Sequence, residues 1–109
     1  MDRNILNFGK MCIQNNDKES LINAINNIET NDYKMNYEYM FSQLLYYSCT
    51  HKKRWAVELF IDMYKNRFDL ISRIGLKHTL IYAKYLHKER EDIIWYESLY
   101  KSAIINNTR

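Results

Sequence analysis

The sequence contains no proline and only two glycines, Gly9 and Gly75. Sheet proteins with many tight turns use more of both residues, because proline and glycine supply the backbone angles that such turns need. Their scarcity argues against a β-rich protein. It favours long helices that are joined by short polar loops.

Cysteine is also scarce, and long apolar runs are missing. Cys12 and Cys49 lie far apart in the sequence and form no motif, so we expect reduced, buried thiols and not a disulfide framework. No apolar stretch follows the first residues as it would in a signal peptide. No run approaches the roughly 20 apolar residues of a membrane span. We therefore expect a soluble protein of the cytoplasm, with the nucleus as the alternative.

The residues that are present suit one small globular domain. The chain has 109 residues, of which 47% are hydrophobic, enough to bury a modest core. The net charge of +3 is uneven, since residues 1–36 carry four basic and five acidic residues and the remainder twelve and eight. This asymmetry is too small to indicate nucleic-acid binding by itself.

Apolar residues recur at spacings of three and four, which predicts amphipathic helices. The expected helices cover residues 3–15, 20–28, 36–49, 52–65, 69–86 and 88–103. Asn36 and Thr50 are the expected N-caps of the third and fourth. The residues expected to face inward are Ile5, Phe8, Met11, Cys12, Leu21, Ile22, Ile25, Ile28, Met40, Phe41, Leu44, Leu45, Tyr46, Tyr47, Val57, Leu59, Phe60, Met63, Leu76, Leu80, Ile81, Tyr82, Tyr85, Ile93, Trp95 or Tyr96, and Leu99.

An internal repeat is the most informative feature of the chain. Residues 36–64 align without a gap on residues 72–100 at a shift of 36 positions, and the first hairpin follows at a shift of 35 by apolar position alone. The identical pairs are Leu44–Leu80, Tyr46–Tyr82, His51–His87, Lys52–Lys88, Arg54–Arg90 and Tyr64–Tyr100.

This repeat predicts an all-α fold with about six helices in three antiparallel hairpins, residues 3–29, 36–65 and 69–104. The hairpins would stack as a short α-solenoid that forms a single domain over residues 1–109, since one hairpin cannot bury its apolar stripe alone. The alternative is a chance similarity between two amphipathic hairpins, and it leaves the helical prediction unchanged.

The segments LLYYSCTHKKRWAVELFIDMYKN and HTLIYAKYLHKEREDIIWYESLY carry a resemblance to a known group. They resemble the divergent ankyrin-like repeats of large DNA viruses, with the multigene-family proteins of African swine fever virus as the nearest comparison. Similar degenerate repeats occur in other giant viruses and in poxviruses. The resemblance implies a viral protein inside the host cell that binds host proteins and modulates innate immunity.

The candidate binding residues lie at the turns of the two repeated hairpins. Stacking would bring both basic turns to one edge, where they could contact an acidic partner or phosphates. Trp55 follows the first turn and would be an anchor if it is exposed. The alternatives are a merely solvated turn and a partly buried Trp55. The candidate residues are His51, Lys52, Lys53, Arg54, Trp55, His87, Lys88 and Arg90.

The sequence offers no catalytic constellation. Cys49 and His51 with one further histidine are too few for a zinc site, neither cysteine has a recognisable partner base, and no glycine-rich phosphate loop is present. We therefore predict a non-enzymatic protein-interaction module without cofactor or metal. The alternatives are a small nucleic-acid-binding protein that uses the basic turns, and a structural homo-oligomer.

Overall fold

The computed structural model describes residues 3–29, 34–66, 73–87 and 89–105, and these residues form helices and short turns without any strand. The prediction of an all-α fold is confirmed. The helices of these ranges are α1 (Arg3–Gln14), α2 (Lys18–Glu29), α3 (Lys34–Thr50), α4 (Arg54–Asn66), α5 (Arg73–Leu86) and α6 (Arg90–Tyr100), and α6 continues into the π-helical stretch η1 (Lys101–Ile105).

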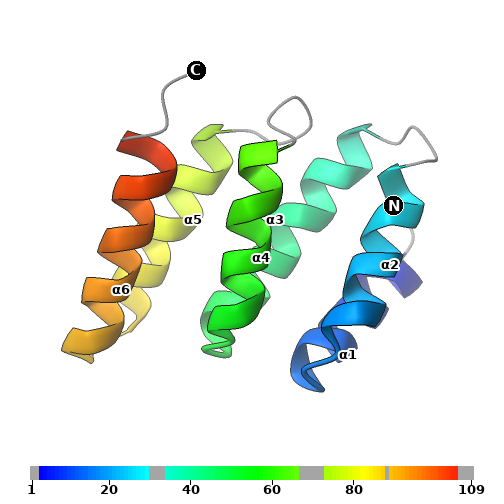
Figure 1. Cartoon of the computed structure of the whole chain (residues 1–109), viewed down its shortest axis with the longest axis horizontal. Coiled ribbons are helices and arrows are strands. Elements are labelled where there is room, and N and C mark those ends of the chain that lie inside the picture. The colour runs from blue at the N-terminus through cyan, green and yellow to red at the C-terminus, as the bar shows by residue number, and fades with distance from the viewer. Residues whose placement is uncertain (1–2, 30–33, 67–72, 88, 106–109) are drawn as a thin grey trace.

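The helices pack as three consecutive pairs, which we call the first, second and third hairpins. α1 packs on α2, α3 on α4, and α5 on α6, while α3 also contacts both α1 and α5. Figure 1 shows the pairs side by side, with α2, α4 and α6 in the nearer layer and α1, α3 and α5 behind them. One apolar core runs between the layers through all three hairpins, and Leu44 and Leu80 are each 1% exposed within it.

Two predicted helix starts are wrong. α3 begins at Lys34, so Asn36 lies inside the helix. Thr50 is the last residue of α3, and its hydroxyl donates to the carbonyl oxygen of Tyr47 at 2.9 Å. The chain then turns through Lys52, whose φ is 55°, before α4 begins at Arg54. Thr50 therefore stabilises the end of one helix and not the start of the next.

The hairpin turns share one backbone hydrogen-bond pattern. At the start of the second helix of each hairpin, the N–H of one residue donates to the carbonyl oxygen four residues earlier. The three equivalent bonds are Leu21 to Asp17 at 3.2 Å, Val57 to Lys53 at 3.1 Å and Ile93 to Glu89 at 3.1 Å. Asn16 and Lys52 also share left-handed φ values of 58° and 55°.

These bonds set the register between the first two hairpins at 36 residues, as it is between the second and third. The predicted shift of 35 is wrong, because it aligned apolar residues that do not occupy equivalent positions in the two hairpins. At a shift of 36, the fully buried Leu21 aligns with the fully buried Val57, and the buried Ile25 aligns with Ile61.

Five side chains expected in the core are exposed: Phe8 at 46%, Met11 at 60%, Tyr46 at 43%, Tyr82 at 49% and Tyr85 at 78%. Phe8 and Met11 belong to the flank of a hairpin that faces the preceding hairpin, and none precedes α1 in the described structure. Tyr85 lies on the opposite flank of the third hairpin, and no hairpin of the described structure follows it there. The rings of Tyr46 and Tyr82 pair with each other, with centres 5.5 Å apart. Ile28 lies outside the residues whose side chains are described.

Candidate functional site

Lys53 and Trp55, two of the predicted contact residues, join the second hairpin to the first. The Lys53 ammonium donates to the carbonyl oxygen of Gln14 at 3.3 Å and to the side-chain oxygen Oδ1 of Asn16 at 3.0 Å. The indole N–H of Trp55 donates to the same Asn16 oxygen at 2.9 Å. One amide side chain in the first turn thus accepts two hydrogen bonds from the start of α4.

Arg54 and Lys52 join the second hairpin to the third. Nη2 of Arg54 lies 2.8 Å from Oδ1 of Asp92, and its guanidinium carbon lies 4.9 Å from the centre of the Trp95 ring. Nζ of Lys52 lies 3.5 Å from the other Asp92 oxygen. The hydrogen bond from Arg54, with the charge of Lys52 beside it, holds the pKa of Asp92 below its ordinary value of 3.8.

The positive turn of the second hairpin is therefore a clamp between its neighbours. We call Asn16, Lys53, Arg54, Trp55 and Asp92 the turn clamp. Charged and aromatic side chains held in defined internal contacts must exchange those contacts before they meet a partner. Because Lys53, Arg54 and Trp55 are engaged in this way, fewer residues of the predicted basic edge are available to bind a partner.

His87 was expected on the same exposed edge, and that expectation is wrong. It is 5% exposed, and its Nε2 lies 2.8 Å from the carbonyl oxygen of Cys49. Because a carbonyl only accepts, Nε2 carries the proton. The ring also stacks on Tyr96 with centres 5.2 Å apart. Arg90 is exposed at the start of α6, while Lys88 lies outside the described residues.

His51 and Lys52 remain exposed at the end of α3. The His51 ring stacks on Tyr47 with centres 3.9 Å apart, and its Nδ1 lies 3.0 Å from the Tyr47 carbonyl oxygen. The phenol of Tyr47 in turn donates to the side chain of Gln14 in α1. The exposed part of the basic turn is thus positioned by α3 itself.

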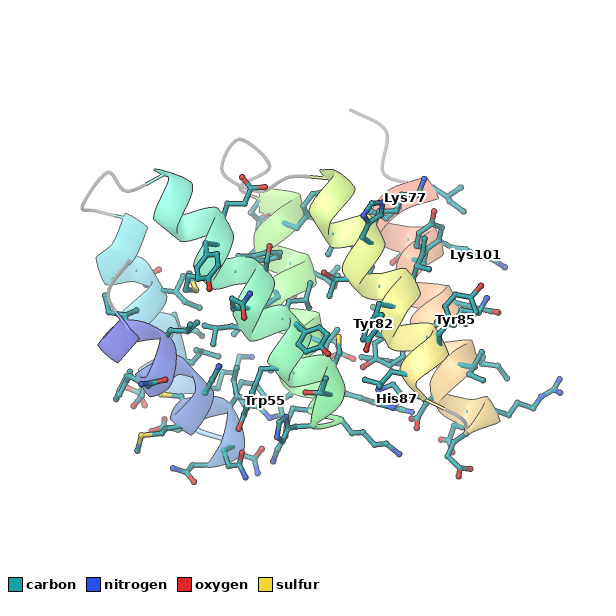
Figure 2. The ribbon with its side chains drawn as sticks, turned by 180° about the vertical axis from the view of Figure 1, so that it is seen from behind. Trp55, Lys77, Tyr82, Tyr85, His87 and Lys101 are labelled. Atoms are coloured by element: carbon teal, nitrogen blue, oxygen red, sulfur yellow. The ribbon has the colours of Figure 1, made fainter. Side chains whose placement is uncertain are left out.

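Beside this turn lies a pair of tyrosines that sequence reasoning placed in the core. The rings of Tyr46 in α3 and Tyr82 in α5 have centres 5.5 Å apart, and Figure 2 shows Tyr82 on the side of α5 that faces α3. A hydrogen bond with Tyr82 raises the pKa of Tyr46. The repeat contained the signal, because equal positions in adjacent hairpins lie side by side. We call this pair the Tyr46–Tyr82 surface.

The cysteines have the surroundings of structural residues. Cys12 and Cys49 are both free and buried. Burial raises the pKa of the Cys49 thiol to about 11, and burial together with the charge of Asp17 raises that of Cys12. Both thiols are therefore protonated at neutral pH, whereas a catalytic cysteine reacts as the thiolate.

The described ranges offer neither a metal-binding cluster nor a membrane-spanning helix. Those ranges contain no group of three or more metal-ligating side chains, and none of their helices has the length and apolar character to cross a bilayer. The chain matches no family model, no curated protein and no solved structure.

Proposed function

We propose that this chain is a non-enzymatic protein-interaction module, a short α-solenoid of degenerate ankyrin-like hairpins that binds its partner through the Tyr46–Tyr82 surface. The observation that carries the proposal is the exposure of two tyrosines at equivalent positions of adjacent hairpins, with ring centres 5.5 Å apart. Tyrosine supplies a large, rigid contact area at a low cost in conformational entropy, and it is enriched among the residues that dominate binding energies.

The surroundings of this pair define the chemistry of the partner. Leu86 is 39% exposed one helical turn after Tyr82, which extends the apolar area. Lys52 adds positive charge just after α3, and its side chain is 58% exposed although it faces Asp92. The complementary ligand is a protein segment with an apolar anchor and a nearby carboxylate, which would compete with Asp92 for Lys52.

The resemblance to viral repeat proteins adds a biological setting to this proposal. On that basis the partner is a host protein of innate immune signalling, and binding takes place in the host cytoplasm. The Tyr46–Tyr82 surface would bind a complementary protein segment in any setting.

Nucleic-acid binding is the less favoured function. Lys53 and Arg54 are engaged by the turn clamp, His87 is buried, and the exposed Glu89 and Glu91 lie beside Arg90. Within the residues that the structure describes, these features leave no continuous positive track for a phosphate backbone. Binding to nucleic acid would fall steeply as salt rises, whereas binding through tyrosine contacts would depend on salt only weakly.

The test begins with site-specific photocrosslinking in host cells. A photoreactive residue replaces Tyr82 in one variant and Glu58, which is exposed on α4, in the control. The position of Tyr82 should crosslink to a protein that the position of Glu58 does not reach. Equal crosslinking at both positions, or crosslinking to RNA or DNA alone, would contradict the proposal.

The affinity of the identified partner then tests the surface directly. The double substitution Tyr46→Ala and Tyr82→Ala should raise the dissociation constant by about tenfold or more, since removing central aromatic contacts costs at least about 1–2 kcal/mol. Glu58→Ala should leave it unchanged. An unaltered affinity in the double variant would show that another surface binds.

A further inference from the structure

The two ends of the hairpin array expose complementary flanks of the same repeat. At the end formed by the first hairpin, Phe8 and Met11 of α1 are 46% and 60% exposed. At the end formed by the third hairpin, Tyr85 is 78% exposed. Figure 2 shows Tyr85 and Lys101 at this second end, on the side of α5 that faces away from α3.

Inside the array, the positions of Phe8 and Met11 contact the preceding hairpin. At the register of 36 residues, Phe8 corresponds to Leu44 and Leu80. Leu44 lies against α1 so closely that a Cβ atom added to Gly9 would be 2.8 Å from its Cδ1. Met11 corresponds to Tyr47, whose ring lies under the ammonium of Lys10 in α1 at 5.7 Å.

The exposed flank of the third hairpin is equivalent to the flank on which the next hairpin packs inside the array. Ile81, Lys84, Tyr85 and Glu97 correspond to Leu45, Ser48, Cys49 and Ile61, which the adjoining hairpins bury to 0–2% exposure. In the third hairpin the same positions line an open cavity of about 470 Å³ between α5, α6 and η1. The cavity is therefore the uncovered half of an interface that the chain already forms internally.

We propose that copies of this chain associate head to tail, with α1 of one copy packed on α5 of the next. Phe8 and Met11 would enter the cavity beside Ile81 and Tyr85, as Leu44 and Leu80 pack on their preceding hairpins.

The polar halves of the two ends match as well. Trp95 of α6 reaches back to Arg54 of the preceding hairpin, and its counterpart in α2 is the exposed Asn23. The counterpart of Arg54 on the receiving end is Arg90, which is exposed at the start of α6. The amide of Asn23 would thus meet a guanidinium, while apolar side chains meet apolar ones. This contact leaves the Tyr46–Tyr82 surface free, so it goes beyond the proposed function.

A head-to-tail contact does not close on itself unless its rotation forms a ring. Sedimentation equilibrium of the full chain from micromolar to millimolar concentration should therefore give an average mass that rises above 13.4 kDa and continues past two copies. A mass of one chain throughout, or a mass that stops at two, would overturn the proposal.

Two single variants test which ends meet. Met11→Asp and Tyr85→Asp each place a charge on one end, at side chains that are 60% and 78% exposed, so the fold should be retained by circular dichroism. Each variant alone should associate more weakly than the unaltered chain, with the dissociation constant raised by about tenfold or more. Tyr39→Asp, at a 51% exposed tyrosine of α3, is the matched control and should associate like the unaltered chain.

Mixing the two variants gives the decisive result. Met11→Asp retains an intact third hairpin and Tyr85→Asp an intact first hairpin, so their mixture should form a one-to-one complex that grows no further. A mixture that stays monomeric would overturn the proposal. The variant with Tyr46→Ala and Tyr82→Ala should self-associate normally, which separates this result from any failure of partner binding.

Discussion

The turns of the second and third hairpins share a His-Lys-x-Arg sequence, yet their side chains have different environments. His51 is exposed, whereas its counterpart His87 is 5% exposed. Arg54 is held by Asp92 at 2.8 Å, whereas Arg90 is exposed. A repeated residue therefore takes its role from the hairpins on either side of it and not from the repeat alone.

The residue one turn before each histidine accounts for part of this difference. His51 stacks on Tyr47 of its own helix. The residue at the same position before His87 is Ala83, which is fully buried and offers no ring. The ring of His87 instead lies against Tyr96 and bonds to the Cys49 carbonyl oxygen of α3. His51, which follows Tyr47, thus lies at the surface, whereas His87, which follows the small Ala83, lies in the interface between two hairpins.

The largest expected effect on stability concerns the leucine that the second and third hairpins share at equivalent positions. Leu44→Ala and Leu80→Ala should each lower the free energy of unfolding by about 2–5 kcal/mol, because each removes a side chain that is 1% exposed and leaves a cavity. Urea denaturation measures both values. A loss below about 1 kcal/mol in either variant would show that this leucine is not packed in the core.

The two histidines should differ in their contribution to stability. His87→Ala should cost about 1–3 kcal/mol, because it removes a buried hydrogen bond to the carbonyl oxygen of Cys49, which keeps only the 3.3 Å bond from the N–H of Lys52. It also leaves a cavity where the ring packs on Tyr96. His51→Ala should change stability by no more than about 0.5 kcal/mol, as is usual for an exposed residue. Equal losses in urea denaturation at neutral pH would contradict the assignment of different roles.

The smallest effect concerns the ion pairs of Asp92 and appears as a dependence on pH. Because Arg54 and Lys52 lower the folded-state pKa of Asp92 below 3.8, the ionised carboxylate stabilises the fold above that value. This stabilisation is lost as the pH falls through the lowered folded-state pKa. Asp92→Asn should therefore be slightly less stable than the unaltered chain at neutral pH, and the two should converge in strong acid.

Thermal unfolding at a series of pH values measures this convergence. Glu91→Gln, at the exposed neighbouring residue, is the matched control and should follow the unaltered chain more closely. The difference should be modest and should shrink with added salt, since exposed ion pairs contribute little. A constant difference between Asp92→Asn and the unaltered chain at all pH values would exclude the carboxylate charge as its cause.

Much of the fold follows from local spacing in the sequence. The apolar residues of each helix identify its buried stripe, and Leu44, Phe60 and Leu80 are buried as predicted. Spacing does not tell which flank of the stripe meets a neighbour. Tyr85 occupies the stripe position of Cys49, yet it is exposed because no further hairpin of the described structure covers it. The left-handed backbone at Lys52, which moves the helix start from Thr50, is likewise invisible when the residue is not glycine.

The residues of the candidate site could be predicted from the sequence, but the contacts that they make could not. The basic turn was recognised from its charge, but the bonds from Lys53 to Asn16 and from Arg54 to Asp92 span 37 and 38 residues. Such contacts depend on how the hairpins are stacked, which spacing within one helix does not determine. The Tyr46–Tyr82 surface was visible in the repeat, but aromatic residues at helical spacing favoured the core.

The Asn16 side-chain oxygen, which receives both Lys53 and Trp55, has a consequence for local fluctuations. If the first turn opens, two polar groups at the start of α4 lose this shared acceptor at the same time. Amide hydrogens early in α4 should then exchange with solvent through the same opening event as those at the end of α1, as expected for one cooperative unit. The side-chain amide of Asn16 would in this way couple the local opening of the first and second hairpins.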